Sequence, residues 1–223
     1  MLNPDPEMAP KTKKQVRTKR LLKAVQSKPV KSELRRAKIL DAAIRIIAKN
    51  GVSDLTFERV GKIAGMARSH VIYYYSDRDT LIMEAIRFAT INAKEIILAH
   101  MGETSSGKRA LVKYIEGNFK WVTQESQDMS LYCLLYYQAT LEKKYSELHE
   151  EIREVGYEIV RKILGTIEEV PSSAIPDLSV NILGVITGNM VDAVSIDRRH
   201  LLRPVRLKQT IKAVEALLES ARR

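Results

Sequence analysis

Hydrophobic residues recur at helical spacing along most of this chain. Between residues 33 and 50 an apolar stripe is followed by Gly51, a residue that typically ends a helix. The stripe comprises Leu34, Ala37, Leu40, Ala43, Ile44 and Ile47. No run of alternating β-branched residues is long enough to indicate a sheet. The pattern therefore predicts an all-α fold that opens with a helix over 33–50.

The next apolar stretch predicts two short helices around a sharp turn. Thr56 is placed to cap the first helix, which carries an apolar stripe and ends at Gly65. That stripe comprises Phe57, Val60, Ile63 and Ala64. In the second helix Ala67, Val71 and Tyr75 fall at i, i+4 and i+8, so we expect them to face inward. Such a pair is typical of a helix-turn-helix.

The outward face of the second helix carries side chains that suit DNA, because Arg, Ser, His and Tyr bind phosphates and base edges. The predicted DNA-binding residues are Thr56, Arg68, Ser69, His70, Ile72, Tyr73, Tyr74 and Arg78. Gly61 lies inside the first of the two helices, where glycine costs about 1 kcal/mol relative to alanine. We expect close packing against a neighbouring helix to be the reason.

The distribution of charged residues along the sequence distinguishes this motif from an ordinary amphipathic helix pair. Residues 1–89 carry 19 Lys or Arg against 9 Asp or Glu, whereas residues 90–223 carry 18 of each. The whole net charge of +10 therefore lies at the end that holds the motif. A segregated basic excess is the electrostatic signature of a domain that binds a polyanion.

The first 31 residues differ from the rest in composition. They contain nine Lys or Arg, only two acidic residues, four prolines and no aromatic residue, so we predict disorder in isolation. Two alternatives stay open for this segment: a solvated tail without a role, or a basic arm that follows phosphates or enters the minor groove.

Four sequence motifs support a more specific assignment. They are AKILDAAIRIIAKNG at 37–51, the capping Thr56, IAG at 63–65 and YYYSDRDTL at 73–81. Together they resemble the DNA-binding domain of the TetR family of bacterial transcriptional regulators. The resemblance spans residues 34–81 and implies a three-helix DNA-binding domain at 32–80, after the arm at 1–31. It further implies that residues 81–223 form a larger helical ligand-binding and dimerisation domain.

The chain departs from the family pattern at three positions. Ala67 stands where the family usually has a capping Ser, Ile72 where it has Tyr, and Tyr75 where it has Phe. Losing the cap costs about 1 kcal/mol unless other groups satisfy the free N–H groups. Ile72 puts one DNA contact in doubt and favours an apolar contact with a thymine methyl group instead.

After residue 79 the sequence predicts helices almost to its end. The expected elements are a linking helix over about 79–101, broken by GETSSG at 102–107, and a helix with Leu111, Ile115, Asn118 and Val122 on one face. The segment 129–141 is apolar nearly all round, so we expect it to be largely buried. A long amphipathic helix with Leu148, Ile152, Val155, Ile159 and Ile163 in register precedes PSSAIPD at 171–177.

The last two helices, predicted over about 178–198 and 205–220, need more than one partner. The first has two apolar stripes, and Gly184 and Gly188 permit close approach of a neighbour. Both stripes pack either inside one subunit or across a two-fold interface. The resemblance implies the second arrangement, a homodimer through the last two helices that binds a palindromic operator.

The second domain also carries polar and aromatic residues on its central helices. They are Asn118, Trp121, Tyr132, Tyr136, Tyr137 and Gln138. Buried aromatic residues usually serve packing alone. The resemblance implies the alternative, a pocket for a small inducer, and a largely apolar cavity with few polar groups suits a hydrophobic or aromatic molecule.

Catalytic and metal-binding motifs are absent from the sequence, so we expect no cofactor, no metal and no enzymatic activity. The histidines His70, His100, His149 and His200 are far apart and have no ligand spacing. His149, followed by two glutamates, is expected on a solvated helix face. We expect the single cysteine, Cys133, to be a buried structural thiol.

The same sequence features bear on where the protein acts. One cysteine excludes a disulfide framework within a subunit. The N-terminus has no apolar signal-peptide core, and no segment offers 18 uninterrupted apolar residues. We therefore expect a cytoplasmic protein without a membrane span.

The sequence thus predicts a homodimeric transcriptional regulator, a repressor released from DNA by a small hydrophobic or aromatic molecule. Two alternatives stay open. One is a ligand-independent or architectural DNA-binding protein whose C-terminal domain only dimerises. The other is an all-α enzyme, for which no catalytic constellation is visible.

Overall fold

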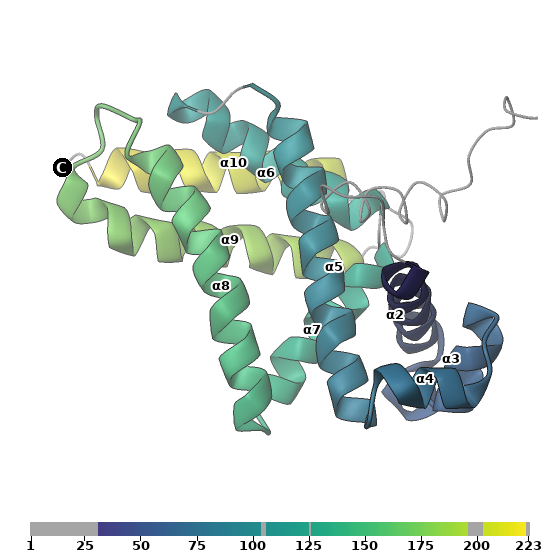
Figure 1. The fold of residues 1–223 in the computed structure, drawn as a ribbon. Coiled ribbons are helices and arrows are strands. Elements are labelled where there is room, and N and C mark those ends of the chain that lie inside the picture. Colours follow the sequence, from purple (N-terminus) through teal and green to yellow (C-terminus); the bar gives the residue numbers. More distant parts are fainter. Residues whose placement is uncertain (1–30, 104–105, 125, 196–202, 222–223) are drawn as a thin grey trace, which may run out of the picture.

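A computed structural model describes residues 31–103, 106–124, 126–195 and 203–221, and this part of the chain contains helices and no strand (Figure 1). The predicted all-α fold is confirmed. The N-terminal unit consists of α2 (Lys31–Asn50), a short 3-10 turn η2 (Val52–Asp54), α3 (Phe57–Ala64) and α4 (Arg68–Tyr74). The predicted arm lies almost entirely outside the described residues.

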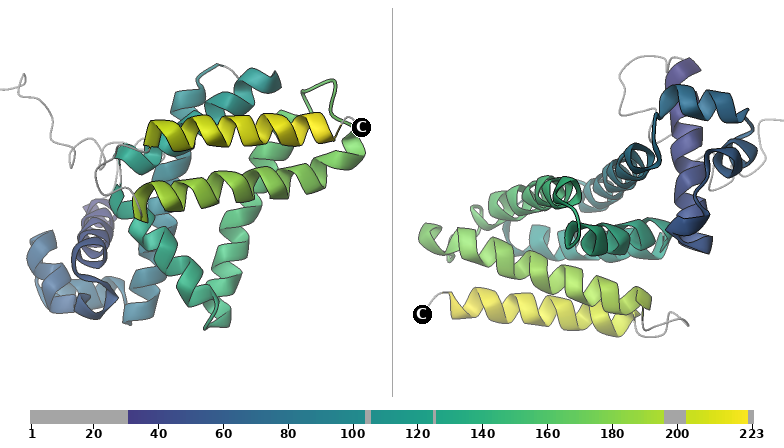
Figure 2. Two further views of the ribbon diagram at one scale, coloured as in Figure 1. Left: turned by 180° about the vertical axis from the view of Figure 1, so that it is seen from behind. Right: turned by 90° about the horizontal axis from the view of Figure 1, so that it is seen from below.

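The larger C-terminal part begins with α5 (Arg78–Met101), which leaves the helix-turn-helix and runs along the molecule (Figure 1). It continues with α6 (Gly107–Gln124), α7 (Ser126–Ala139) and α8 (Lys143–Leu164), and after the 3-10 turn η3 (Ser172–Ala174) with α9 (Ile175–Ser195) and α10 (Arg203–Ser220). α9 and α10 pack side by side as an outer layer (Figure 2). α4 lies far from that layer (Figure 2).

Two hydrophobic cores form, and α5 contributes to both. Its first half, including Leu81 and Ala89, packs with α2, α3 and α4, while its second half, including Ile96, packs with α6, α8 and α9. The first core also contains Leu131 and Leu135 from α7. The predicted domain boundary at residue 80 therefore falls within the continuous helix α5. The hydrophobic core of the N-terminal helices also includes residues of α7 and α8.

α7 is less buried than expected, since the 129–141 segment was predicted to be largely buried. Leu131 and Leu135 are buried, but Tyr137 is 63% exposed and Cys133 is exposed. The prediction of a buried thiol was wrong, because an all-round apolar helix has no periodicity to indicate which face packs. The apolar stretch Ser172–Ser195 is long and apolar enough to cross a membrane by length and composition, which is weak evidence because core helices meet the same criteria.

Candidate DNA-binding surface and ligand pocket

Local chemistry builds the helix-turn-helix as the sequence predicts. The Thr56 hydroxyl oxygen accepts a hydrogen bond from the Arg59 backbone N–H at 3.2 Å, which caps α3. Gly65 ends α3 with a φ of 71°, a left-handed conformation that glycine adopts without the steric cost of a Cβ. Ile63 departs from the predicted inward stripe, because it is 39% exposed and Val60 forms the buried contact.

Gly61 is explained by the turn that follows its helix. A Cβ at this position would lie 2.7 Å from the Met66 carbonyl oxygen and 3.4 Å from the Arg68 backbone nitrogen. The neighbour that requires glycine is thus the backbone entering α4. This close approach fixes the position of α4 against α3.

α4 is held by one buried edge and exposes the other. Val71 and Tyr75 are buried, as predicted, whereas Ala67 is exposed at the N-cap. Ala67 forms no side-chain cap, and its carbonyl oxygen accepts from the His70 N–H at 3.0 Å. The missing cap leaves the first turn of α4 with backbone N–H groups available to another acceptor.

Most of the predicted DNA-binding side chains are exposed. Those of Thr56, Arg68, Ser69, His70, Ile72, Tyr73 and Arg78 are exposed, and Tyr74 is half-buried. Tyr73 is 82% exposed, and its ring meets that of Tyr74 edge to face with centroids 5.2 Å apart. Arg78 donates from its guanidinium to the Val52 carbonyl oxygen at 2.7 Å, so this side chain also joins α5 to the turn before α3.

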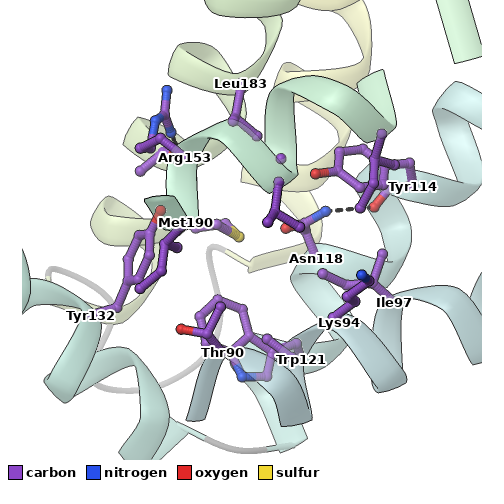
Figure 3. Close-up of a pocket in the computed structure, with 16 residues that line it drawn as sticks. Thr90, Lys94, Ile97, Tyr114, Asn118, Trp121, Tyr132, Arg153, Leu183 and Met190 are labelled. Carbon is purple, nitrogen blue, oxygen red and sulfur yellow. Dashed lines mark hydrogen bonds between the residues drawn. The ribbon is translucent and has the colours of Figure 1, made fainter. Parts of the chain in front are cut away.

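A cavity of about 80 Å³ lies in the C-terminal part, between α5, α6, α7, α8 and α9 (Figure 3). That volume has room for roughly five to eight water molecules. Lys94 and Val155 on its wall are exposed, so it opens to solvent between α5 and α8. The lining residues are Thr90, Ala93, Lys94, Ile97, Tyr114, Asn118, Trp121, Tyr132, Ile152, Arg153, Val155, Gly156, Ile159, Leu183, Thr187 and Met190.

Three of the six predicted pocket residues line this cavity. Asn118 and Trp121 project from α6 and Tyr132 from α7, and the Asn118 amide nitrogen donates to the Tyr114 carbonyl oxygen at 2.9 Å (Figure 3). Burial raises the pKa of Tyr114 to about 12, so its phenol stays protonated at neutral pH.

The other three predicted residues do not line the cavity. Tyr136 packs beside it, with its ring centroid 5.2 Å from that of Tyr132 and 4.3 Å from that of His149. Tyr137 points to solvent, and Gln138 lies on the next position of the helix. Successive residues of a helix point about 100° apart, so α7 presents only part of its aromatic run to the cavity.

Sequence reasoning missed the polar wall that α8 supplies. Arg153 donates to the Thr187 hydroxyl at 2.9 Å and to the Tyr157 hydroxyl at 3.1 Å. His149, predicted on a solvated face, is half-buried, and its Nε2 atom is buried without a hydrogen-bond partner. Burial and then the charge of Arg153 lower the pKa of His149, which favours a neutral ring at pH 7. The sequence did offer a signal for Arg153, because it is a charged residue between the apolar positions Ile152 and Ile159.

No group of three or more His, Cys, Asp or Glu side chains that could hold a metal ion occurs among the described residues. The geometry instead combines an exposed helix-turn-helix with a separate small-molecule-sized cavity. α5 connects the two, because it begins four residues after α4 and carries four of the cavity-lining residues.

Residues 39–85 match the family profile described as bacterial regulatory proteins, tetR family. The match includes α3, α4 and most of the surface described above. This segment is therefore a TetR-family DNA-binding domain. The N-terminal helices of the chain are the family's DNA-binding unit, as the sequence motifs indicated.

Sequence relatives of this chain are HTH-type transcriptional regulators. An HTH-type transcriptional regulator BetI from Brucella anthropi is 28% identical over 104 residues, which cover 47% of this chain and 53% of the relative. A BetI from Escherichia coli is 24% identical over 156 residues, 59% of this chain and 80% of the relative. The first match thus spans about half of its relative's length.

Among solved structures, a transcriptional regulator from Saccharomonospora viridis in complex with choline aligns with a TM-score of 0.69. It is 17% identical, and the alignment covers 85% of this chain and 97% of that one. A TetR-family regulator from a Rhodococcus species has a TM-score of 0.70 at 16% identity, covering 82% and 98%. At these identities the likeness shows that this chain shares the fold of those regulators, including the C-terminal helices.

Proposed function

We propose that this TetR-family protein is a cytoplasmic, homodimeric repressor whose sequence-specific DNA binding is released by a small molecule in the α5–α9 cavity. The observation that carries the proposal is the continuity of α5. Its first turn follows the DNA-facing helix, and Thr90, Ala93, Lys94 and Ile97 in its second half line the cavity. A ligand that prefers one tilt of α5 would therefore shift the position of α4.

On the DNA side, we propose that α4 enters the major groove. Ser69, His70 and Tyr73 would face base edges, while Tyr74 and Arg78 contact phosphates. Their shared exposure supports this assignment. The basic arm before residue 31 would add phosphate contacts.

Homodimerisation through α9 and α10 is supported by the apolar face that these helices leave uncovered. Val180 on α9 is 50% exposed and Val205 on α10 is 48% exposed. A Cβ built at Gly184 or Gly188 meets no atom of a neighbouring described element within 4 Å. Packing α9 and α10 against the same pair of a second subunit would bury this face and present two α4 helices to a palindromic site.

For the ligand, we propose a small molecule with an apolar or aromatic body. The cavity wall is mostly apolar, with few polar groups, as is typical of small-molecule sites. A structural neighbour holds choline, which supports the use of this fold for a small organic ligand. The alternative is a ligand-independent DNA-binding protein whose C-terminal helices only dimerise it.

The test begins with the full-length protein and a random duplex library, from which bound sequences are selected. Affinity for a selected duplex and for its shuffled counterpart is then compared at two salt concentrations, since phosphate contacts alone give equal salt-dependent binding. We expect at least a ~1,000-fold preference for the selected duplex. Equal affinities would support the architectural alternative.

Ligand control is tested separately with small molecules that change the fluorescence of Trp121. This residue is the only tryptophan and lines the cavity, so the signal is local. Each molecule that binds is titrated with and without the selected duplex. Linkage requires the same fold-change in both directions, about 5- to 150-fold for typical allosteric couplings. Equal ligand affinities in both titrations would exclude induction.

A further inference from the structure

The charged groups on the cavity wall are all cationic. Among its sixteen lining residues Lys94 and Arg153 carry positive charge, and none is Asp or Glu. They come from α5 and α8, and Figure 3 shows Lys94 beside Asn118 and Arg153 on the side of Tyr132. Positive charge on two walls gives the space between them a potential that attracts anions.

Arg153 has no counter-charge among the described residues. Its guanidinium donates to the neutral hydroxyls of Tyr157 and Thr187, and no carboxylate of the described residues lies at ion-pairing distance. Burial disfavours the charged form, but the Tyr157 hydrogen bonds and the nearby Tyr136 and Tyr132 keep the pKa of Arg153 raised. By contrast, Arg161 on the same helix pairs with Glu154.

The groups that face Arg153 leave its charge uncompensated. Tyr132 is protonated, because burial raises the pKa of its phenol. His149, one helical turn before Arg153, cannot accept a proton easily, since burial and the Arg153 charge lower its pKa. A half-buried guanidinium has five N–H donors in a planar fork, a geometry that matches a carboxylate.

The nearest buried carboxylate has another role. Asp128 on α7 accepts from the Asn92 amide at 2.9 Å and lies 3.5 Å from the Trp121 indole nitrogen. It is not among the cavity-lining residues. Its contacts with Asn92 and Trp121 hold the indole that lines the cavity.

We propose that the ligand of this cavity is a small amphiphilic carboxylate, whose carboxylate group pairs with Arg153 and whose apolar body packs on Trp121, Leu183 and Met190. The inference rests on the proposed function, because it specifies the ligand of the same site. Lys94 at the mouth attracts the anion during entry, while the Arg153 fork and the Thr187 hydroxyl define its bound orientation.

The experiment uses three probes with the same apolar chain and different head groups: octanoate, 1-octanol and octyltrimethylammonium. Each is titrated into the full-length protein below its micelle concentration, with Trp121 fluorescence and calorimetry as readouts. We expect octanoate to bind about ten-fold or more tightly than either other probe, since hydrogen bonds to charged groups contribute more than neutral ones.

Two variants isolate the guanidinium. Arg153→Met should weaken octanoate binding about ten- to hundred-fold and leave 1-octanol unchanged, whereas Arg153→Lys should retain part of the octanoate preference. Arg161→Met, on the same helix but outside the cavity, is the matched control and should bind octanoate like the wild type. Circular dichroism verifies that each variant is folded.

The outcomes separate this inference from the proposed function. Preference for octyltrimethylammonium, or equal binding of all three probes, would overturn the carboxylate assignment and leave a ligand-binding cavity. Binding of none of them to the folded protein would overturn the cavity as a ligand site and, with it, ligand control. Carboxylate-selective binding that does not alter affinity for a selected duplex would uphold the inference and contradict induction.

Discussion

Lys144, in the first turn of α8, donates a hydrogen bond to the Asp79 carboxylate in the first turn of α5, with 2.6 Å between nitrogen and oxygen. The pair joins the start of the helix that carries Arg153 to the residues directly after the DNA-facing helix. About two helical turns further on, Arg87 and Glu151 pair across the same two helices. A movement of α8 would therefore be transmitted to the N-terminal end of α5.

We predict that Lys144→Met reduces ligand control more than it reduces DNA affinity. The pair is exposed, so its effect on stability is expected to be small. The hydrogen bond to Asp79, then that to Glu142, raises the pKa of Lys144. The contribution of this ion pair to the stability of the fold is therefore complete at pH values below 10.5, the ordinary pKa of lysine. It is lost only as the pH rises through the raised pKa of Lys144. The measurement is the fold-change in duplex affinity on adding ligand, with Lys143→Met as control. An unchanged coupling would refute the role of this pair.

Tyr73→Ala should weaken binding to the selected duplex by about 1 to 3 kcal/mol without altering stability. The side chain is 82% exposed and its ring contacts that of Tyr74, so its removal leaves no buried cavity. Tyr73→Phe separates the hydroxyl from the ring. The control is Tyr137→Ala, which removes an exposed tyrosine from α7. If Tyr73→Ala binds the selected duplex like the wild type, α4 is not the reading helix.

Arg78→Ala should weaken binding to selected and shuffled duplexes alike. A phosphate contact carries no base information, and its loss lowers the salt slope by about 1. Because Arg78 also donates to the Val52 carbonyl, thermal unfolding is measured in parallel. Arg109→Ala, an exposed arginine in the first turn of α6, serves as the control. A loss confined to selected duplexes would indicate base reading instead.

Gly61→Ala should destabilise the protein by about 1 to 3 kcal/mol, although alanine is the better helix former. The added Cβ would lie 2.7 Å from the Met66 carbonyl oxygen, and backbone cannot yield as a side chain can. Urea unfolding followed by circular dichroism measures the change. At Gly165, where the nearest atom to a Cβ is 3.5 Å away, alanine should be tolerated. Equal stabilities of the two variants would contradict the close approach.

Gly188→Leu should convert the proposed dimer to monomers while each subunit stays folded. A Cβ at this position meets no atom of a neighbouring element within 4 Å in the described part of the chain, so the larger side chain is accommodated unless a second subunit lies there. Sedimentation velocity gives the oligomeric state. Lys162→Leu adds the same side chain to an exposed position of α8 as a control. A Gly188→Leu protein that remains dimeric would place the interface elsewhere.

The sequence by itself determined what depends on neighbours three or four residues away. Thr56 caps α3 by accepting a hydrogen bond from the Arg59 N–H, three residues away, and Gly65 ends the same helix in a left-handed conformation. The burial of Val71 and Tyr75 follows from their helical spacing. These local rules were enough to predict the all-α fold, the helix-turn-helix and the exposed face of α4, and the family motifs lie in the same segment.

Only the tertiary structure decided how remote helices meet. The exposure of Cys133 and Tyr137 depends on the rotation of α7, which its uniform apolar sequence does not encode. Arg153 enters the cavity because α8 packs against α9 and α6, and Lys144 meets Asp79 across 65 residues of sequence. Spacing within a helix fixes which residues share a face, whereas the partner of that face is chosen by packing among several helices at once.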